Sequence, residues 1–202
     1  MTPTPNPAAP APKKSSTATV IIVILVVGLV LCCVIGMLAA IAIPNFVRFQ
    51  AKSKQAEVRS NLKAAYVAEM AYFASENAYS ADVGKVGFNP SPANRYLYAF
   101  STEGDLAASG APGDGKTGVL ADAARFGIDN DALEKGVPPG LWAETGVQGT
   151  CPDACSITIV AAGNVDNDST IDVWSISTKD RTIGGQRVPA GQPHNHVDDV
   201  AE

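Results

Sequence analysis

The chain of 202 residues carries 15 Lys and Arg against 20 Asp and Glu, a formal net charge of -5. That acidic balance excludes the basic domain expected of a nucleic-acid-binding protein. Residues 18–43 form a run of 26 residues without one charged side chain, which excludes a simple soluble single-domain protein.

The first segment, residues 1–17, contains five prolines among Thr, Ala and Asn. It has too few large apolar side chains to pack, so we expect a disordered cytoplasmic tail.

The apolar run over residues 18–43 predicts a transmembrane helix. At 26 residues, the helix would measure about 39 Å, enough to cross a hydrocarbon core of about 30 Å. A secretory signal peptide is the alternative, because Lys13 and Lys14 precede the run and Ala40-Ile41-Ala42 fits a cleavage pattern. The apolar part of a signal peptide spans only about 7–15 residues, so we favour an uncleaved anchor.

The charges around this run do not support the orientation that we expect. Two lysines precede it, whereas Arg48, Lys52, Lys54 and Arg59 follow, which by count favours the reverse topology. We nevertheless expect the C-terminal part outside, because it is the part with enough chain to fold and it carries a close pair of cysteines.

Small residues recur every four positions in the run, at Gly28, Cys32, Gly36 and Ala40, and Pro44 continues the spacing. This places them on one helix face, where a second helix can approach closely. The alternative is that Gly and Ala are simply common in membrane helices.

Helix-forming sequence resumes after Pro44 and reaches about Asn77. One apolar stripe is expected at Val58, Leu62, Ala65, Tyr66, Met70 and Phe73. The result is a single helix of about 55–60 residues, half in lipid and half outside.

Short β segments follow the helix. Arg95–Phe100 predicts a strand, and Ser156–Ala162 with Ile171–Ser177 predicts an antiparallel hairpin. We expect an α+β fold in which the amphipathic half of the helix packs on a small antiparallel sheet. The head would span residues 44–183, and residues 184–202 would form a flexible tail.

The stretch Gly36–Phe46, GMLAAIAIPNF, resembles the N-terminal helix of type IV pilins and of the pseudopilins of type II secretion. Weaker matches are Ala71-Tyr72-Phe73, Tyr79-Ser80, Gly87-Phe88-Asn89-Pro90, Asn94-Arg95-Tyr96 and Ala162-Gly163-Asn164. The resemblance implies a structural protein that associates with pilin or pseudopilin components through its helix. It also implies a single pass through the bacterial inner membrane with the head in the periplasm; a pilus is the alternative location.

The chain departs from this family at the start of the helix. Aligned on Pro44-Asn45-Phe46, the family's cleavage-site Gly, first mature Phe and nearby Glu fall on Ile22, Val23 and Val27. The missing Gly implies that the prepilin peptidase does not cleave, and the missing Glu removes a carboxylate that would be costly unpaired in lipid.

Cys151 and Cys155 are expected to close a small disulfide loop in an exported head. Asp166, Asp168, Thr170 and Asp172 are similar in spacing to the first half of a calcium loop, and some pseudopilins bind calcium in this region. If calcium binds, the alternative function is a membrane-tethered binding module with a calcium-stabilised hairpin loop. The turn Gly and the distal Glu are missing, so an Asn/Asp-rich hairpin turn is the alternative structure. No other cofactor is predicted.

Residues 110–117, GAPGDGKT, match the phosphate-loop pattern G-x-x-x-x-G-K-[ST]. That motif needs an apolar strand before it and a helix after it. Ser101–Ser109 is polar and Val119–Phe126 predicts only a weak helix, so we expect no nucleotide here.

The two histidines, His194 and His196, both lie in the expected tail, where they would be solvated. A Ser or Cys nucleophile would then have no base, and we predict no enzyme.

Overall fold

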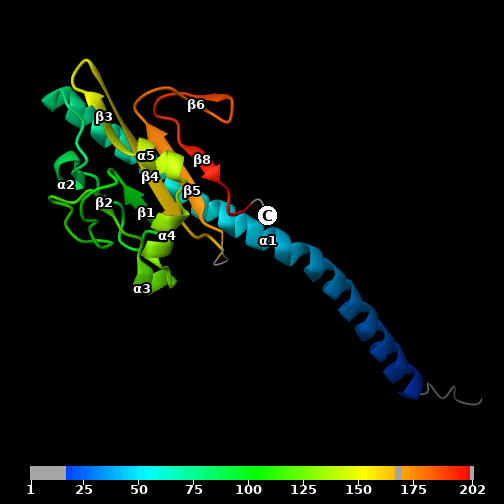
Figure 1. Ribbon diagram of the computed structural model, residues 1–202. Helices are drawn as coiled ribbons and strands as arrows, with labels where there is room; N and C mark the ends of the chain where they lie inside the picture. Colours follow the sequence, from blue (N-terminus) through cyan, green and yellow to red (C-terminus); the bar gives the residue numbers. More distant parts are fainter. Residues whose placement is uncertain (1–16, 167–169, 201–202) are drawn as a thin grey trace, which may run out of the picture. The chain divides into compact units, whose positions relative to one another are not determined.

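The computed structural model describes residues 17–166 and 170–200. The tail expected over residues 1–17 therefore lies outside the described residues, apart from Thr17. The chain divides into two compact units, Met1–Val47 and Arg48–Glu202, and each is described on its own. One helix, α1 (Thr17–Glu76), contains residues of both units (Figure 1).

Helix α1 is 60 residues long, which confirms the single helix of about 55–60 residues. It continues through Pro44, whose nitrogen has no hydrogen to donate to the carbonyl of Ala40. One residue later, the side-chain amide of Asn45 donates to the carbonyl oxygen of Ile41 at 3.0 Å. A side-chain hydrogen bond is thus added in the turn where the backbone loses one.

Unit 2 contains a six-stranded sheet in the order β2-β1-β4-β5-β8, with β3 also paired to β4, and all of these strand pairs are antiparallel. The strands are β1 (Tyr96–Ala99), β2 (Gly118–Val119), β3 (Gly146–Thr150), β4 (Ala154–Gly163), β5 (Asp172–Ser177) and β8 (His194–Val197). A separate hairpin joins β6 (Arg181–Ile183) to β7 (Gln186–Val188). The short helices are α2 (Val83–Val86), α3 (Ala123–Phe126), α4 (Asn130–Gly136) and α5 (Pro139–Glu144).

The predicted strands are confirmed. β1 lies within the strand expected at Arg95–Phe100. β4 and β5 pair from Thr158 opposite Ser177 to Gly163 opposite Asp172, which confirms the predicted hairpin.

The sheet is covered on both faces, as Figure 1 shows with α1 behind the strands and α4 and α5 in front of them. Alternate residues of one strand point to opposite faces of a sheet. Accordingly Tyr96, Tyr98 and Phe100 pack in the cluster that includes α1, whereas Leu97 and Ala99 pack in the cluster that includes α4 and α5.

The buried stripe of α1 differs in part from the predicted one. Val58, Leu62 and Ala65 are buried as expected, but Met70 is 39% exposed and Glu69 is fully buried. The buried positions are Ala51, Gln55, Val58, Leu62, Ala65 and Glu69. Their spacing alternates between four and three residues, and this periodicity, rather than side-chain polarity, selects Glu69 for the interior.

The segment after Gly184 also differs from the flexible tail expected for residues 184–202. β8 pairs with the outer edge of β5, with Trp174 opposite Asn195 and Ser175 opposite His194. A polar sequence can form this strand because β8 supplies backbone hydrogen bonds to the outer edge of β5, the edge that β4 does not occupy.

Three neighbouring strands meet at Gly163, which pairs with Tyr96 of β1 on one side and Asp172 of β5 on the other. The ring of Tyr96 lies over Gly163, and its hydroxyl donates to Oδ2 of Asp172 at 2.6 Å. A Cβ on residue 163 would lie 2.5 Å from Cδ1 of that ring, so only Gly leaves room for it.

The carboxylate of Asp172 is fully buried and accepts hydrogen bonds from several elements. The indole nitrogen of Trp174 donates to Oδ2 at 2.6 Å, while the amides of Gln55 and Asn195 each donate to Oδ1 at 3.1 Å. Burial raises the pKa of Asp172, and the donors Tyr96 and Trp174 oppose that rise. The cluster therefore joins α1, β1, β5 and β8.

We predict that Gly163→Ala lowers the free energy of unfolding by about 1–3 kcal/mol, because the new methyl group must displace the Tyr96 ring. The matched control is Gly140→Ala in α5, where a Cβ meets no atom within 4 Å. The control should leave stability unchanged or raise it by up to about 1 kcal/mol, since Ala is the better helix former. Thermal unfolding followed by near-UV circular dichroism measures both, and equal stability of the two variants would contradict the packing argument.

Candidate functional site: the exposed faces of the long helix

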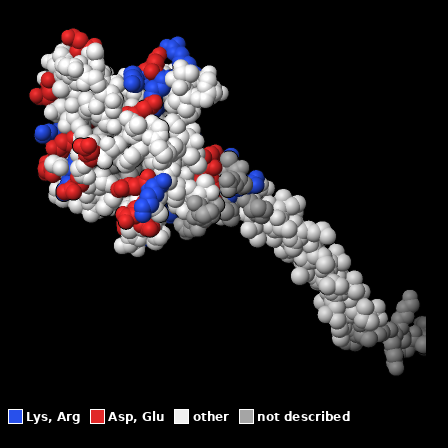
Figure 2. Space-filling model, viewed as in Figure 1, with Lys and Arg blue, Asp and Glu red and all other residues white. Residues whose placement is uncertain are grey.

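The part of α1 in unit 1 exposes a dense set of aliphatic side chains. From Val20 to Ile43 the large apolar residues are 47–71% exposed. Among the described residues, α1 is the one helix long and apolar enough to cross a membrane by length and composition. Figure 2 shows this stretch without any blue or red atom. Exposing apolar surface to water costs about 25 cal/mol of free energy per Å². The segment is therefore suited to an apolar environment.

The small residues Gly28, Cys32, Gly36 and Ala40 lie in this exposed stretch. A Cβ built on Gly28 or Gly36 meets nothing within 4 Å, so the space beside both glycines is open. Cys32 and its neighbour Cys33 are exposed and form no disulfide. Open space of this kind is what close approach of a second helix requires. Nothing is described of the Pro44 side chain, although its backbone is helical.

Basic side chains follow on the part of α1 that belongs to unit 2. Lys54 and Lys63 donate to the backbone carbonyls of Val165 and Gly191. The guanidinium of Arg59 lies 4.8 Å from the centroid of the Trp174 ring. These contacts bind the helix to the loops around β5 and β8.

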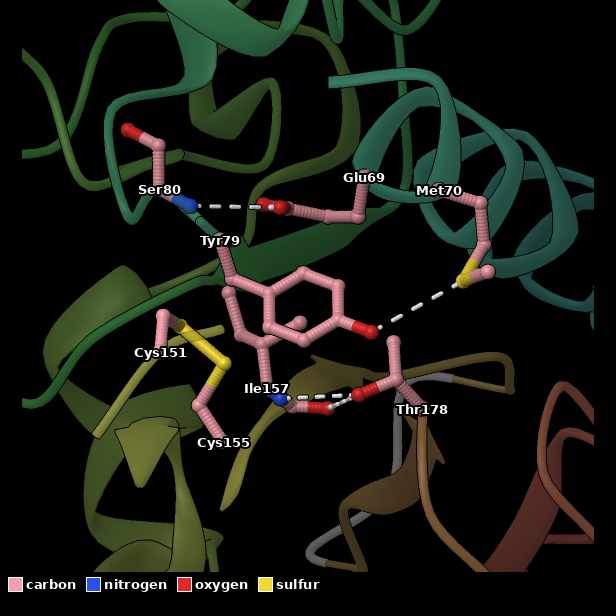
Figure 3. Close-up of a disulfide and its surroundings, with 8 residues drawn as sticks. All are labelled: Glu69, Met70, Tyr79, Ser80, Cys151, Cys155, Ile157 and Thr178. Atoms are coloured by element: carbon pink, nitrogen blue, oxygen red, sulfur yellow. Dashed lines mark hydrogen bonds between the residues drawn. A yellow bond between two sulfur atoms is a disulfide. The ribbon is translucent and has the colours of Figure 1, made fainter. Parts of the chain in front are cut away.

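Glu69 lies on the sheet side of α1 with its carboxyl group buried (Figure 3). Its Oε2 accepts from the backbone N–H of Ser80 at 3.3 Å, while Oε1 has no hydrogen-bond partner among the described residues. Burial raises the pKa of Glu69 to about 7. At neutral pH the group is therefore partly protonated inside the head.

The two cysteines expected to pair form a disulfide with a Cα–Cα distance of 4.9 Å. The bond closes the turn between β3 and β4, beyond the pair Thr150 and Ala154. Figure 3 draws the disulfide with its surroundings, which include Glu69 and Tyr79.

The expected calcium residues are only partly placed. Asp168 lies outside the described residues, and Asp172 points into the core, where both oxygens accept hydrogen bonds. In the described part of the chain, no group of three or more His, Cys, Asp or Glu side chains is arranged to hold a metal ion.

The loop that matches the phosphate-binding pattern, residues 110–117, packs on α2. The N–H of Gly115 donates to the carboxylate of Asp82 at 3.1 Å, and Lys116 pairs with Asp105 at 3.2 Å. Two of the groups that a phosphate would use at this loop, the N–H of Gly115 and the ammonium of Lys116, are thus engaged by carboxylates.

A serine–histidine pair that the sequence analysis did not predict joins β5 to β8. Nε2 of His196 lies 2.7 Å from Oγ of Ser175. Burial and the charges of His194 and Arg181 lower the pKa of His196 to about 4. Ser175 is fully buried, so a substrate cannot reach its oxygen.

The comparisons with known proteins agree with this arrangement. The family model of the type IV pilin PilA matches residues 49–172. The chain is also 39% identical over 193 residues to the type IV major pilin protein PilA of Myxococcus xanthus strain DK1622. That alignment covers 83% of this chain and 87% of the relative. The chain belongs to the type IV pilin family.

Membership of the pilin family points to a structural protein that assembles with other pilin subunits. It is compatible with a location at the membrane or in a pilus. The candidate functional site is therefore the surface of α1 rather than a catalytic cleft.

Glu69 and the pair Ser175 and His196 were not predicted from the sequence. The spacing of three and four residues through Leu62 and Ala65 leads to Glu69 and could have revealed it. His194 and His196 alternate with Asn195 in a short polar run, where no apolar residue marks a strand before Val197.

We predict that Glu69 makes the head less stable as the pH rises. The pKa is about 7 in the folded state and 4.5 in the reference state, so the folded protein binds this proton more tightly. The contribution of Glu69 to stability should be largest below pH 4.5 and fall by up to about 3 kcal/mol as the pH rises through 7.

The variant Glu69→Gln should lose most of this decline between pH 5 and pH 8, because its amide stays neutral. Glu76→Gln, at the exposed end of α1, serves as the control and should keep it. Burial also raises the pKa values of Glu57 and Asp172, so the measured quantity is the difference between each variant and the wild type. Melting temperatures measured across this range would contradict the assignment if Glu69→Gln declined like the wild type.

Proposed function

We propose that this pilin is a non-enzymatic subunit of a type IV pilus or a type II secretion assembly, anchored uncleaved in the bacterial inner membrane. Its apolar helix would cross the bilayer once, with the head in the periplasm. The observation that carries the proposal is the exposed apolar stretch of α1 with its open small-residue face, in a chain of the pilin family.

Two further observations support the anchored and exported arrangement. Ile22, Val23 and Val27 stand where the family resemblance implies the Gly, Phe and Glu of processing and assembly. The disulfide of the head suits an oxidising compartment such as the periplasm.

A processed filament subunit is the second candidate. It is favoured by the relative, a major pilin whose sequence aligns over 87% of its length. In that case, the helix would begin close to Val23 in the mature protein.

The intact mass of the membrane-extracted protein distinguishes the two. The full-chain mass would support the uncleaved anchor, whereas loss of residues up to about Ile22 would make the filament subunit the better proposal. Loss through Ala42 would mean a signal peptide and would overturn both. Purified surface filaments, tested for the protein by immunoblotting, provide an independent measurement.

The small-residue face should determine association of the helix in the membrane. We expect Gly36→Ile to weaken self-association in a membrane reporter assay by about 1 kcal/mol, roughly fivefold, because the larger side chain keeps the two backbones apart. Val34→Ile, two residues away and so on a different helix face, is the control and should change little. Equal effects of the two variants would count against a specific packing face.

A further inference from the structure

A groove beside α1 carries basic side chains and a cavity of about 550 Å³. It is lined by Arg59 and Lys63 of α1, by Trp174 of β5 and by residues 192–195. Arg59 and Lys63 are exposed and four residues apart, so they are neighbours on one face of the helix. No Asp or Glu lines the groove in the described part of the chain. The groove is therefore positive, although residues 64–202 carry 19 Asp and Glu against 8 Lys and Arg.

Both basic side chains are held in place by the head itself. The guanidinium of Arg59 lies 4.8 Å from the centroid of the Trp174 ring, and it forms no hydrogen bond or ion pair among the described residues. The ammonium of Lys63 donates to the carbonyl of Gly191 and has further hydrogens to donate. Because both side chains are already ordered, an anionic partner would pair with them at a small cost in side-chain entropy.

A complementary acidic pair lies on α4. Asp131 and Glu134 are exposed and three residues apart, so they too are neighbours on one face of a helix. Neither carboxylate forms an ion pair among the described residues, not even with Lys135 of the same helix. The other short helices carry at most one acidic residue each. Helix α4 is therefore the short helix that matches the groove best in charge and in spacing.

The basic groove and the acidic pair belong to helices on opposite faces of the sheet. Helix α1 packs behind the strands through Val58 and Leu62, whereas α4 packs in front of them through Leu133 (Figure 1). The groove of one head therefore cannot reach the acids of its own α4, but it can meet those of another copy. Contact between two different patches gives a head-to-tail interface, which repeats from copy to copy into a ring or an open filament.

We propose that the groove at Arg59 and Lys63 binds Asp131 and Glu134 of a second copy of this chain. Charge complementarity selects this occupant, since two cations meet two carboxylates at a comparable helical spacing. Membership of the pilin family points to assembly with other subunits, which brings copies of the head close together. The inference rests on the assembly in the proposed function and deepens it, whether or not the chain is cleaved.

The test reverses these charges in the full chain in density-matched detergent micelles and measures association by analytical ultracentrifugation. The groove variant combines Arg59→Glu with Lys63→Glu, and the helix variant combines Asp131→Lys with Glu134→Lys. Each variant alone should associate about tenfold or more weakly than the wild type, because like charges then face each other. Mixing the two should restore association, since the reversed groove of one variant meets the reversed helix of the other.

Matched controls make the same changes of charge at exposed positions elsewhere on the head. Lys85→Glu with Arg187→Glu corresponds to the groove variant, and Glu103→Lys with Asp153→Lys corresponds to the helix variant. Both controls should associate like the wild type.

Cross-linking of the wild type provides a second measurement that needs no variant to fold. A carbodiimide joins a lysine to a carboxylate without a spacer, so it reports direct contact. In a mixture of ¹⁴N- and ¹⁵N-labelled copies, mass spectrometry should find Lys63 of one copy joined to Asp131 or Glu134 of the other.

The proposal would be wrong if the wild type stayed monomeric, if the reversed variants associated like it, or if their mixture stayed dissociated. A loss seen in the groove variant but not in the helix variant would show that the groove binds another anion, which also overturns it. If the groove variant does not fold, the helix variant and the cross-link decide the outcome. Failure here differs from failure of the proposed function, because the intact mass and the effect of Gly36→Ile do not depend on these charges.

Discussion

The buried carboxylate of Asp172 is the constraint on which the architecture of the head depends. A charge in the interior must be met by donors, and here they come from Tyr96, Trp174, Gln55 and Asn195 on four different elements. These donors reach one point only if β1, β4 and β5 keep their present register and α1 keeps its present rotation. A buried polar group of this kind specifies one arrangement among the many that apolar contacts alone would allow.

Helix α1 combines two surfaces with different requirements. In unit 2 its inward stripe repeats at alternating steps of three and four residues and packs on the sheet. In unit 1 its apolar side chains are exposed, and the space beside Gly28 and Gly36 is open. Since these groups have no counterpart among the described residues, lipid and other helices are their natural partners, which agrees with membership of the pilin family.

Much of this fold was predictable from the sequence, because α1, β1 and the hairpin of β4 and β5 have clear apolar patterns. β8 was not, since His194, Asn195 and His196 belong to the sheet through backbone pairing and polar contacts rather than through burial of apolar side chains. Glu69 and Arg181 were missed for a related reason: their charge suggests a surface position, and only the packing around them shows that they are buried. The disulfide was easier to predict, because Cys151 and Cys155 are only four residues apart in the sequence.

The lengths of the outer strands limit how copies of this protein can join. In the described part of the chain the sheet ends in β2, of two residues, and in β8, of four, while the free side of β3 includes Gly146 and Gly149, both with positive φ. Short or irregular edges are poor templates for the addition of a foreign strand. Even where many heads are crowded together, these edges therefore disfavour the merging of sheets into amyloid-like aggregates.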